Sequence, residues 1–259
     1  MTKRALITGA SKGIGYEFAR ILAANQYDLV LTARSEHRFF EIKQELEEKY
    51  KIKVFVVPVD LTIPHVADEI FYELSRKDME IDVLINNAGF GEYGKFSETD
   101  WKVERQILQL NIVTLTNLTK LYVKRMLERG GGKVLNVASV AAFQPGPLMS
   151  VFFATQAYIL SFSEALAYEL KDSPVTVTVL CPGPTESGFQ AVAHMENTRI
   201  VKNRRLQSAQ EVAEYGYRAM MAGRRIAVPG LTNKILAQSS RFLPRTILTD
   251  LVGHMHQPE

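Results

Sequence analysis

The feature that most constrains this chain is a series of short apolar segments that alternates with helical patterns along its length. These segments are apolar in succession rather than in alternation, which is typical of strands buried on both faces of a parallel sheet. Right-handed crossovers through the intervening helices then predict a doubly wound, Rossmann-type α/β sheet of about seven strands, with helices on both faces. The expected strands are residues 4–7, 28–33, 52–60, 81–89, 133–139, 175–181 and 226–230.

Helical patterns fill the intervals between the expected strands, at residues 14–25, 35–50, 64–77, 98–128, 149–171 and 208–223. Pro64 suits the first turn of the third helix, a break is expected before Trp101, and Ser208 has the chemistry of an N-cap. No repeat or linker divides the chain, so we expect a single domain over residues 1–259. Residues 184–207 and 230–259 have no clear place in the sheet and are expected around a ligand crevice or a subunit contact.

The composition excludes several functional classes. Hydrophobic residues make up 46% of the 259 residues and charged residues 23%, so an ordinary core can form. The net charge of +3 is too small to indicate nucleic-acid binding, and the basic run at residues 202–205 is expected on solvated surface.

The cysteine and histidine content indicates the cellular compartment and whether a metal site is expected. The single cysteine, Cys181, suits a reducing cytosol, so we expect a cytoplasmic protein. No apolar run of about 18 residues and no signal-like start is present, so neither a membrane span nor a membrane-surface partner is expected. The five histidines lack zinc-site spacing with the cysteine, so no metal is expected, and His254 and His256 are expected in a frayed tail.

A glycine-rich turn, TGASKGIG at residues 8–15, lies between the first expected strand and the first expected helix. Glycines allow a tight turn and a close approach of backbone to a ligand, and the helix start directs free N–H groups at an anion. Such turns also close strands for purely structural reasons, but this one is the first β–α turn, where dinucleotide diphosphates bind. The candidate binding residues are Gly9, Ser11, Lys12, Gly13, Ile14 and Gly15.

Two basic residues indicate which dinucleotide is bound. Arg34 follows the second expected strand, where an acidic residue would favour NAD and an arginine suits the 2′-phosphate of NADP. Lys12 adds a second cation in the glycine turn. Both could be ordinary surface charges, but both fall where the phosphate would lie, so the sequence predicts NADP(H).

These features together resemble the short-chain dehydrogenase/reductase family, over about residues 3–230. The glycine turn is similar to the family's cofactor turn, and five further motifs follow in the family's order. They are the adenine-binding pair Asp60-Leu61, the NNAG motif Asn86-Asn87-Ala88-Gly89, the structural and catalytic Asn111, the catalytic Ser139, and Pro182-Gly183 followed by Ser187 on the nicotinamide side.

The resemblance implies hydride transfer between nicotinamide and a carbonyl or alcohol carbon. In the family a serine holds the substrate oxygen, a tyrosine passes the proton, a lysine binds the ribose and lowers the tyrosine pKa, and the asparagine holds a water. Residues 184–207 are similar in place to the family's variable substrate loop, and an apolar lining is expected from Phe189, Val192, Met195 and Ile200. The resemblance further implies an apolar small-molecule substrate and a homodimer or homotetramer.

The segment VFFATQ, residues 151–156, departs from the family at two positions. Its spacing from Ser139 places Phe152 where the family has tyrosine and Gln156 where it has lysine. Phenylalanine cannot donate or accept a proton, and general acid–base catalysis contributes about 10²- to 10⁴-fold. Gln156 can still bind a ribose hydroxyl through its amide.

Three interpretations follow: an NADP(H)-binding member with little turnover, an active oxidoreductase with an unusual proton donor, or an enzyme disabled on purpose. A regulatory protein that uses NADP(H) as a ligand is a further alternative. Candidate replacement donors are Tyr93 on a loop at the pocket rim and a water held by Ser139 and Asn111. Tyr158 is expected to face away, because it lies six positions after Phe152 on one helix.

The C-terminal segment, about residues 230–259, is expected to form two amphipathic pieces split at Pro244. Its apolar positions are Ile235, Leu236, Phe242, Leu243, Ile247, Leu248 and Leu251. We expect this segment to cover the pocket or a neighbouring subunit.

Overall fold

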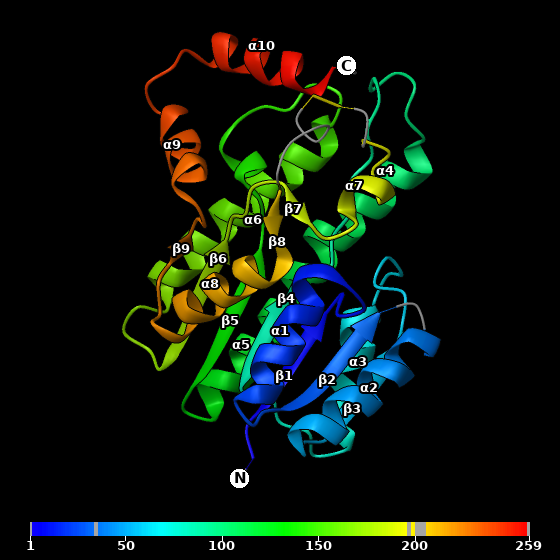
Figure 1. Cartoon of the computed structure of the whole chain (residues 1–259). Helices are drawn as coiled ribbons and strands as arrows, with labels where there is room; N and C mark the ends of the chain where they lie inside the picture. Colours follow the sequence, from blue (N-terminus) through cyan, green and yellow to red (C-terminus); the bar gives the residue numbers. More distant parts are fainter. Residues whose placement is uncertain (1, 34–35, 196–197, 200–205, 258–259) are drawn as a thin grey trace.

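A computed structural model describes residues 2–33, 36–195, 198–199 and 206–257, and its centre is one parallel sheet. The order of its seven strands is β3-β2-β1-β4-β5-β6-β9, and every pairing is parallel. The doubly wound α/β fold expected from the sequence is therefore confirmed (Figure 1). The strands are β1 (Arg4–Thr8), β2 (Asp28–Ala33), β3 (Val54–Pro58), β4 (Val83–Asn86), β5 (Gly132–Val137), β6 (Val175–Leu180) and β9 (Ile226–Ala227).

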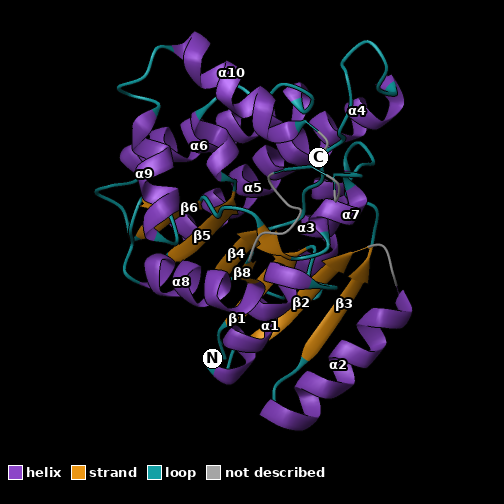
Figure 2. Ribbon diagram, turned by 45° about the horizontal axis from the view of Figure 1, so that its top comes forward, coloured by secondary structure: helices purple, strands orange, loops and turns teal. Residues whose placement is uncertain are grey.

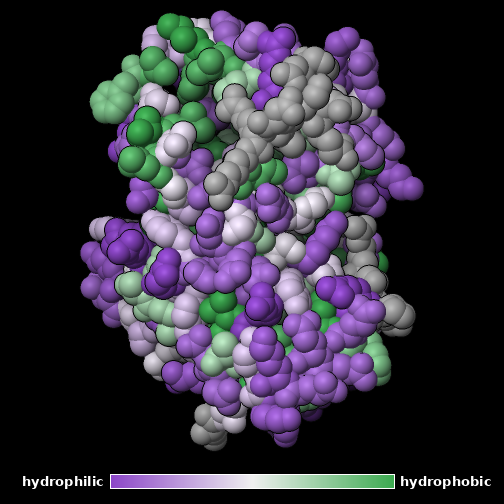
Figure 3. Space-filling view, viewed as in Figure 1, coloured by the Kyte–Doolittle hydropathy of each residue, from purple (hydrophilic) through white to green (hydrophobic). Residues whose placement is uncertain are grey.

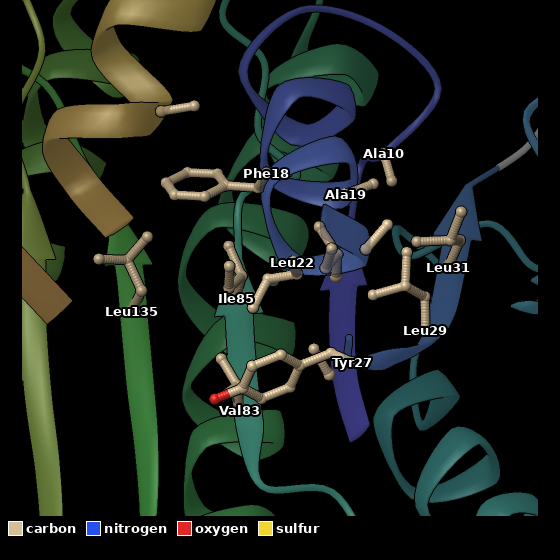
Figure 4. Packing of buried hydrophobic residues seen from close by; sticks show 14 of the residues in the cluster. Ala10, Phe18, Ala19, Leu22, Tyr27, Leu29, Leu31, Val83, Ile85 and Leu135 are labelled. Carbon is tan, nitrogen blue, oxygen red and sulfur yellow. The ribbon is translucent and has the colours of Figure 1, made fainter. Parts of the chain in front are cut away.

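Helices cover both faces of this sheet (Figure 2). One face packs against α1 (Gly13–Ala24), α2 (Glu36–Tyr50) and α8 (Ala209–Met221). The other packs against α3 (Val66–Arg76), α5 (Leu115–Glu128) and the end of α6 (Ser150–Glu169). Because successive side chains of a strand point to opposite faces, Ala5 and Ile7 enter the first core and Leu6 enters the second. Figure 4 shows part of the first core, a single cluster that includes Phe18 and Leu22 of α1 with Leu29, Leu31 and Ile85 of the sheet.

Two helix predictions need correction. The third helix begins at Val66 rather than at Pro64, because His65 adopts a left-handed conformation with φ of 65° and interrupts the helical path. The segment 98–128 is broken before Trp101 as expected, and the side chain of Asp100 caps α4 (Trp101–Leu108) by accepting from the Lys102 amide at 2.9 Å. Between α4 and α5 the chain forms a π-helical turn, η1 (Gln109–Thr114), which sequence periodicity did not predict.

The two segments without a predicted place in the sheet lie beyond the carboxyl ends of its strands (Figure 1). Residues 184–207 contribute a short parallel pair, β7 (Thr185–Glu186) with β8 (Gln207–Ser208), and the short helix α7 (Phe189–Val192). The C-terminal segment forms α9 (Leu231–Ser239) and α10 (Arg245–His256), which are separated at Pro244 as predicted. Ile200 lies outside the described residues.

Figure 3 shows apolar side chains gathered over α9 and the turn that follows it. The most exposed apolar residues of these two segments are Leu231, Ile235 and Phe242. Within the described ranges, no helix combines the length and the hydropathy needed to cross a membrane.

A buried polar chain ties the centre of the sheet to α5 and α6. The Asn86 amide nitrogen donates to Asn136 Oδ1 and to Thr119 Oγ, each at 2.9 Å, and the Asn136 amide nitrogen donates to Ser163 Oγ at 2.9 Å. Asn136 and Ser163 are almost fully buried. Loss of any acceptor in this chain would leave an N–H group without water or a protein partner, which destabilises the folded state.

We expect Ser163→Ala to lower the free energy of unfolding by about 1–3 kcal/mol, because the Asn136 amide is left unsatisfied in the core. Urea denaturation followed by circular dichroism measures this change. Ser161→Ala is the matched control, since Ser161 is exposed on the same helix. Equal stability of the two variants would contradict the importance of this hydrogen bond.

Candidate functional site

The glycine turn forms a narrow backbone cradle between β1 and α1. Gly9 and Gly13 have φ of 67° and 57°, in the left-handed region that favours glycine. A Cβ atom on Gly9 would lie 2.9 Å from the Cα of Ala88, and one on Gly15 would overlap the Gly9 carbonyl oxygen and the Asn87 amide. Only glycine fits these positions, so the turn packs tightly against the segment that follows β4.

The end of β4 holds this turn in place. Thr8 Oγ accepts from the backbone amides of Asn87 and Ala88, at 2.9 and 3.0 Å. The side-chain amide of Asn87 donates to the carbonyl oxygens of Thr8 and Gly9, each at 3.0 Å. The NNAG segment therefore acts as a brace that joins the carboxyl ends of two neighbouring strands.

A cleft of about 810 Å³ opens along the carboxyl ends of the strands, at the edge where the glycine turn lies. Parallel sheets place ligand crevices at this edge, where the strand order reverses. The predicted residues that line it are Gly9, Ser11, Lys12, Ile14, Asp60, Leu61, Asn87, Ala88, Gly89, Ser139, Phe152, Gln156, Pro182, Gly183 and Ser187. Gly13, Gly15 and Asn111 are not part of its lining, and Arg34 lies outside the described residues.

Ser139 stands at the end of β5 and begins the short 3₁₀ helix η2 (Val140–Phe143). Its Oγ accepts from the Ala141 amide at 3.2 Å and lies 3.4 Å from the carbonyl oxygen of Pro182, to which it donates. Phe152 and Gln156 lie one turn apart on α6, so both face the cleft beside this serine.

Asn111 and Gln156 share one hydroxyl. The Asn111 amide nitrogen donates to Thr155 Oγ at 3.0 Å and to the Phe90 carbonyl at 3.1 Å, and the Gln156 amide nitrogen lies 3.3 Å from the same Oγ. Thr155 in turn donates to the Phe152 carbonyl at 2.7 Å. Asn111 Oδ1 is buried without a hydrogen-bond partner in the described part of the chain. The network is neutral throughout, and the π-helical turn η1 carries Asn111 into it.

The surroundings of Phe152 are apolar. Its ring packs against those of Phe189 and Phe153, with centroids 5.0 and 6.1 Å away. Met149 and Met195 belong to the same cluster. The expected apolar lining from Phe189, Val192 and Met195 is also found in the cleft.

The two tyrosines considered as replacement donors are both engaged elsewhere. The Tyr158 hydroxyl pairs with Thr116 Oγ at 2.9 Å on the outer side of α6, as its helical position predicted. The Tyr93 hydroxyl donates to the backbone carbonyl of His256 at 2.7 Å, and burial raises its pKa. Neither tyrosine lines the cleft.

Sequence reasoning missed several lining residues, among them Gln144, Met149, Phe153, Met255 and His256. His256 is 1% exposed, so its expected place in a frayed tail is wrong. The apolar positions of α10 indicated a buried face, but they did not indicate that a histidine would follow that face into the cleft. Among the described residues, no cluster of side chains could hold a metal ion.

The sequence profile of the short chain dehydrogenase family matches residues 3–197. The very-long-chain 3-oxoacyl-CoA reductase of Rattus norvegicus is 31% identical over 183 residues, covering 69% of this chain and 58% of that protein. The 17-beta-hydroxysteroid dehydrogenase type 3 of the same species is 33% identical over 205 residues, covering 78% and 65%. The chain thus spans less than two thirds of the length of either relative.

Among solved structures, a short-chain dehydrogenase from Sphingobium yanoikuyae in complex with NADPH superposes with a TM-score of 0.83 at 28% identity. The superposition covers 93% of this chain and 92% of that one. A ketone-specific alcohol dehydrogenase from Comamonas testosteroni superposes with a TM-score of 0.79 at 27% identity, covering 93% and 92%.

We expect Gly15→Ala to lower the free energy of unfolding by about 1–3 kcal/mol, because the new methyl group overpacks the contact between the turn and Asn87. Urea denaturation measures the effect. Gly253→Ala is the control, since it lies within α10 and its nearest neighbour, Pro147, would be 3.3 Å away. Wild-type stability in Gly15→Ala would contradict the close packing of the turn.

Proposed function

Because the chain belongs to the short-chain dehydrogenase family, we propose that it binds NADP(H) in the cleft and is directed at a carbonyl or alcohol carbon, with turnover crippled at Phe152 and Gln156. The observation that carries this proposal is that both side chains line the cleft beside Ser139, in apolar and neutral surroundings. The proposed domain is the whole of residues 1–259, with 184–207 as substrate loop and 230–259 as C-terminal extension.

The glycine turn fits the diphosphate of a dinucleotide. Added Cβ atoms on Gly9 and Gly15 would collide with Ala88, Asn87 and the Gly9 carbonyl, so glycine keeps this turn tight. The start of the 12-residue helix α1 directs backbone N–H groups toward a bound phosphate. Gly13 and Gly15 would act by keeping this backbone close to the ligand, although their own atoms do not line the cleft. Asp60 and Leu61 also line the cleft, and the adenine would bind beside them.

The choice of NADP(H) over NAD(H) rests on charge. Lys12 is an exposed cation in the glycine turn that lines the cleft, and Arg34 follows β2 in the sequence. Both would neutralise a 2′-phosphate through charge-assisted hydrogen bonds. The related dehydrogenase from Sphingobium yanoikuyae was solved with NADPH, which supports this choice.

The nicotinamide would supply the hydride, and the side chains around it would hold the substrate. In this proposal the Ser139 hydroxyl turns from its 3.4 Å contact with the Pro182 carbonyl and donates its hydrogen bond to the substrate oxygen. The amide of Gln156 binds a ribose hydroxyl. Pro182, Gly183 and Ser187 hold the nicotinamide side of the cleft. Phe152 offers no proton where the family has tyrosine, which removes a contribution of about 10²- to 10⁴-fold.

The neutral hydrogen-bond network around Thr155 explains how Phe152 and Gln156 can occur together. A lysine in place of Gln156 would be a buried charge facing a phenyl ring, which costs several kcal/mol unless it is paired. With glutamine, the hydrogen bond to Thr155 keeps the position neutral and partly satisfied. Asn111 Oδ1 would accept from a bound water beside this pair, since it has no partner among the described residues.

The proposed substrate is an apolar carbonyl compound or alcohol. Aromatic and sulfur-containing side chains of α6, α7 and the substrate loop make up much of the lining. The two relatives compared above are named for a very-long-chain 3-oxoacyl-CoA and a 17-beta-hydroxysteroid, whose acyl chain and steroid skeleton are large and apolar. These names support the class of substrate for this chain.

We further propose a cytoplasmic homodimer or homotetramer. The outer surfaces of α4 and α6 expose Trp101 and Tyr168, at 63% and 59%. The family resemblance places subunit contacts on the two long helical segments predicted at residues 98–128 and 149–171, which contain these two side chains. Burial of such aromatic side chains between subunits would stabilise an oligomer.

The cofactor assignment predicts that Lys12→Ala and Arg34→Ala each weaken NADPH binding about five- to tenfold, because each removes a charge-assisted hydrogen bond to the 2′-phosphate. NADH binding should not change. Isothermal titration calorimetry with both cofactors measures the difference. Lys3→Ala is the control, since Lys3 is exposed just before β1, at the end of the strand remote from the cleft. Equal weakening of NADH binding would argue against a phosphate contact.

The proposed loss of turnover predicts that the Phe152→Tyr, Gln156→Lys double variant oxidises NADPH with apolar ketones at least about 10²-fold faster than the wild type. The rate is followed by the loss of NADPH absorbance, and NADPH affinity is measured in parallel. Phe152→Tyr alone should restore less of the NADPH oxidation rate than the double variant, because no lysine lowers the tyrosine pKa. Ordinary family turnover by the wild type, or an inert double variant that still binds NADPH, would overturn the proposed defect.

A further inference from the structure

Helix α10 closes the apolar end of the cleft through its last turns. Val252, Met255 and His256 line the cleft from this helix. The helix is held there by the hydrogen bond from Tyr93 Oη to the His256 carbonyl oxygen, at 2.7 Å. The position of the His256 side chain is therefore determined by contacts with distant parts of the chain.

The imidazole of His256 is held on two sides. Its Nδ1 lies 2.8 Å from the carbonyl oxygen of Pro147. Its ring meets that of Phe153 edge to face, with centroids 5.2 Å apart. Because a carbonyl oxygen only accepts hydrogen bonds, Nδ1 must carry the proton in this contact.

The other ring nitrogen, Nε2, is then a bare acceptor whenever the ring is neutral. Burial lowers the pKa of His256, with the bond to Pro147 opposing this in part, so the ring is neutral near pH 7. Within the described residues, no hydrogen bond is formed by Nε2, although the side chain lines the cleft. An unpartnered hydrogen-bond acceptor in an apolar pocket favours ligands that place a hydrogen-bond donor beside it.

We propose that Nε2 of His256 accepts a hydrogen bond from a hydroxyl group of the substrate that is remote from the reacting carbon. The inference rests on the proposed function, which places the reacting carbon beside Ser139 and Phe152. His256 lies beyond Phe153, the next residue on α6, so it contacts the far end of a bound molecule. The favoured substrate class is a bulky apolar ketone or alcohol with a second, donor hydroxyl.

The same geometry disfavours other classes of substrate. A purely apolar substrate would bury Nε2 without a partner, and a substrate with only an ether or carbonyl there would set two acceptors against each other. A carboxylate at this end would favour a protonated imidazole, which the apolar surroundings oppose. His256 is thus a specificity-determining residue that does not touch the reacting atoms.

The test compares three aryl ketones that differ only in the para substituent of the ring: 4-(4-hydroxyphenyl)butan-2-one, 4-phenylbutan-2-one and 4-(4-methoxyphenyl)butan-2-one. Dissociation constants are measured by isothermal titration calorimetry of the full chain, with and without NADPH. We expect the hydroxyl compound to bind about tenfold more tightly than the other two, because it alone satisfies Nε2. His256→Phe should abolish this preference, and His256→Gln, which keeps an acceptor, should retain part of it.

Binding of 4-phenylbutan-2-one is the internal control for an intact pocket: it should not weaken in either variant, and it should tighten in His256→Phe, where no acceptor is left without a partner. The inference is overturned if the wild type binds the three ketones equally or binds none of them, if His256→Phe keeps the preference, or if all three weaken together in that variant. Binding, not turnover, is measured, so a catalytically inert chain still gives a result. Absence of NADPH binding with the ketone preference intact would count against the proposed cofactor and leave His256 in its role.

Discussion

The contact between the glycine turn and the end of β4 is the constraint on which the cleft depends. A single side-chain amide, that of Asn87, donates hydrogen bonds to the carbonyl oxygens of Thr8 and Gly9. The contact is so close that a side chain at position 15 would collide with the Gly9 carbonyl and the Asn87 amide. This contact holds β1 and β4 together at the point where the order of the parallel sheet reverses direction. The cradle at the start of α1 and the cleft beside it exist because these backbones approach so closely.

The other end of the cleft is held together by neutral hydrogen bonds and aromatic packing. There the polar atoms of Asn111, Thr155 and Gln156 form a short neutral network, and Phe152 packs among aromatic side chains. A charged residue in this region would need a partner, and neither Phe152 nor Gln156 carries a charge. In the function proposed above, this end of the cleft binds and positions a ligand but lacks the side chains that would move a proton.

The sequence predicted the site more fully near the sheet than away from it. Turn and strand-end residues such as Gly9, Asn87 and Ser139 could be placed in one cleft because parallel strands all end at the same edge. Asn111 was identified as a site residue, but the π-helical turn that carries it has no signal in helical periodicity. His256 was misjudged, because its burial depends on Pro147 and Tyr93, more than a hundred residues earlier in the chain.

The sequence by itself determined the layered sheet, the glycine turn and the presence of Phe152 and Gln156 on the helix beside Ser139. These follow from local patterns, since apolar runs, turn glycines and side-chain chemistry are properties of neighbouring residues. Only the tertiary structure decided which side chains face the far end of the cleft and which tyrosine hydroxyls are already engaged. Those outcomes depend on contacts between segments far apart in the chain, and such contacts leave no periodic trace in the sequence.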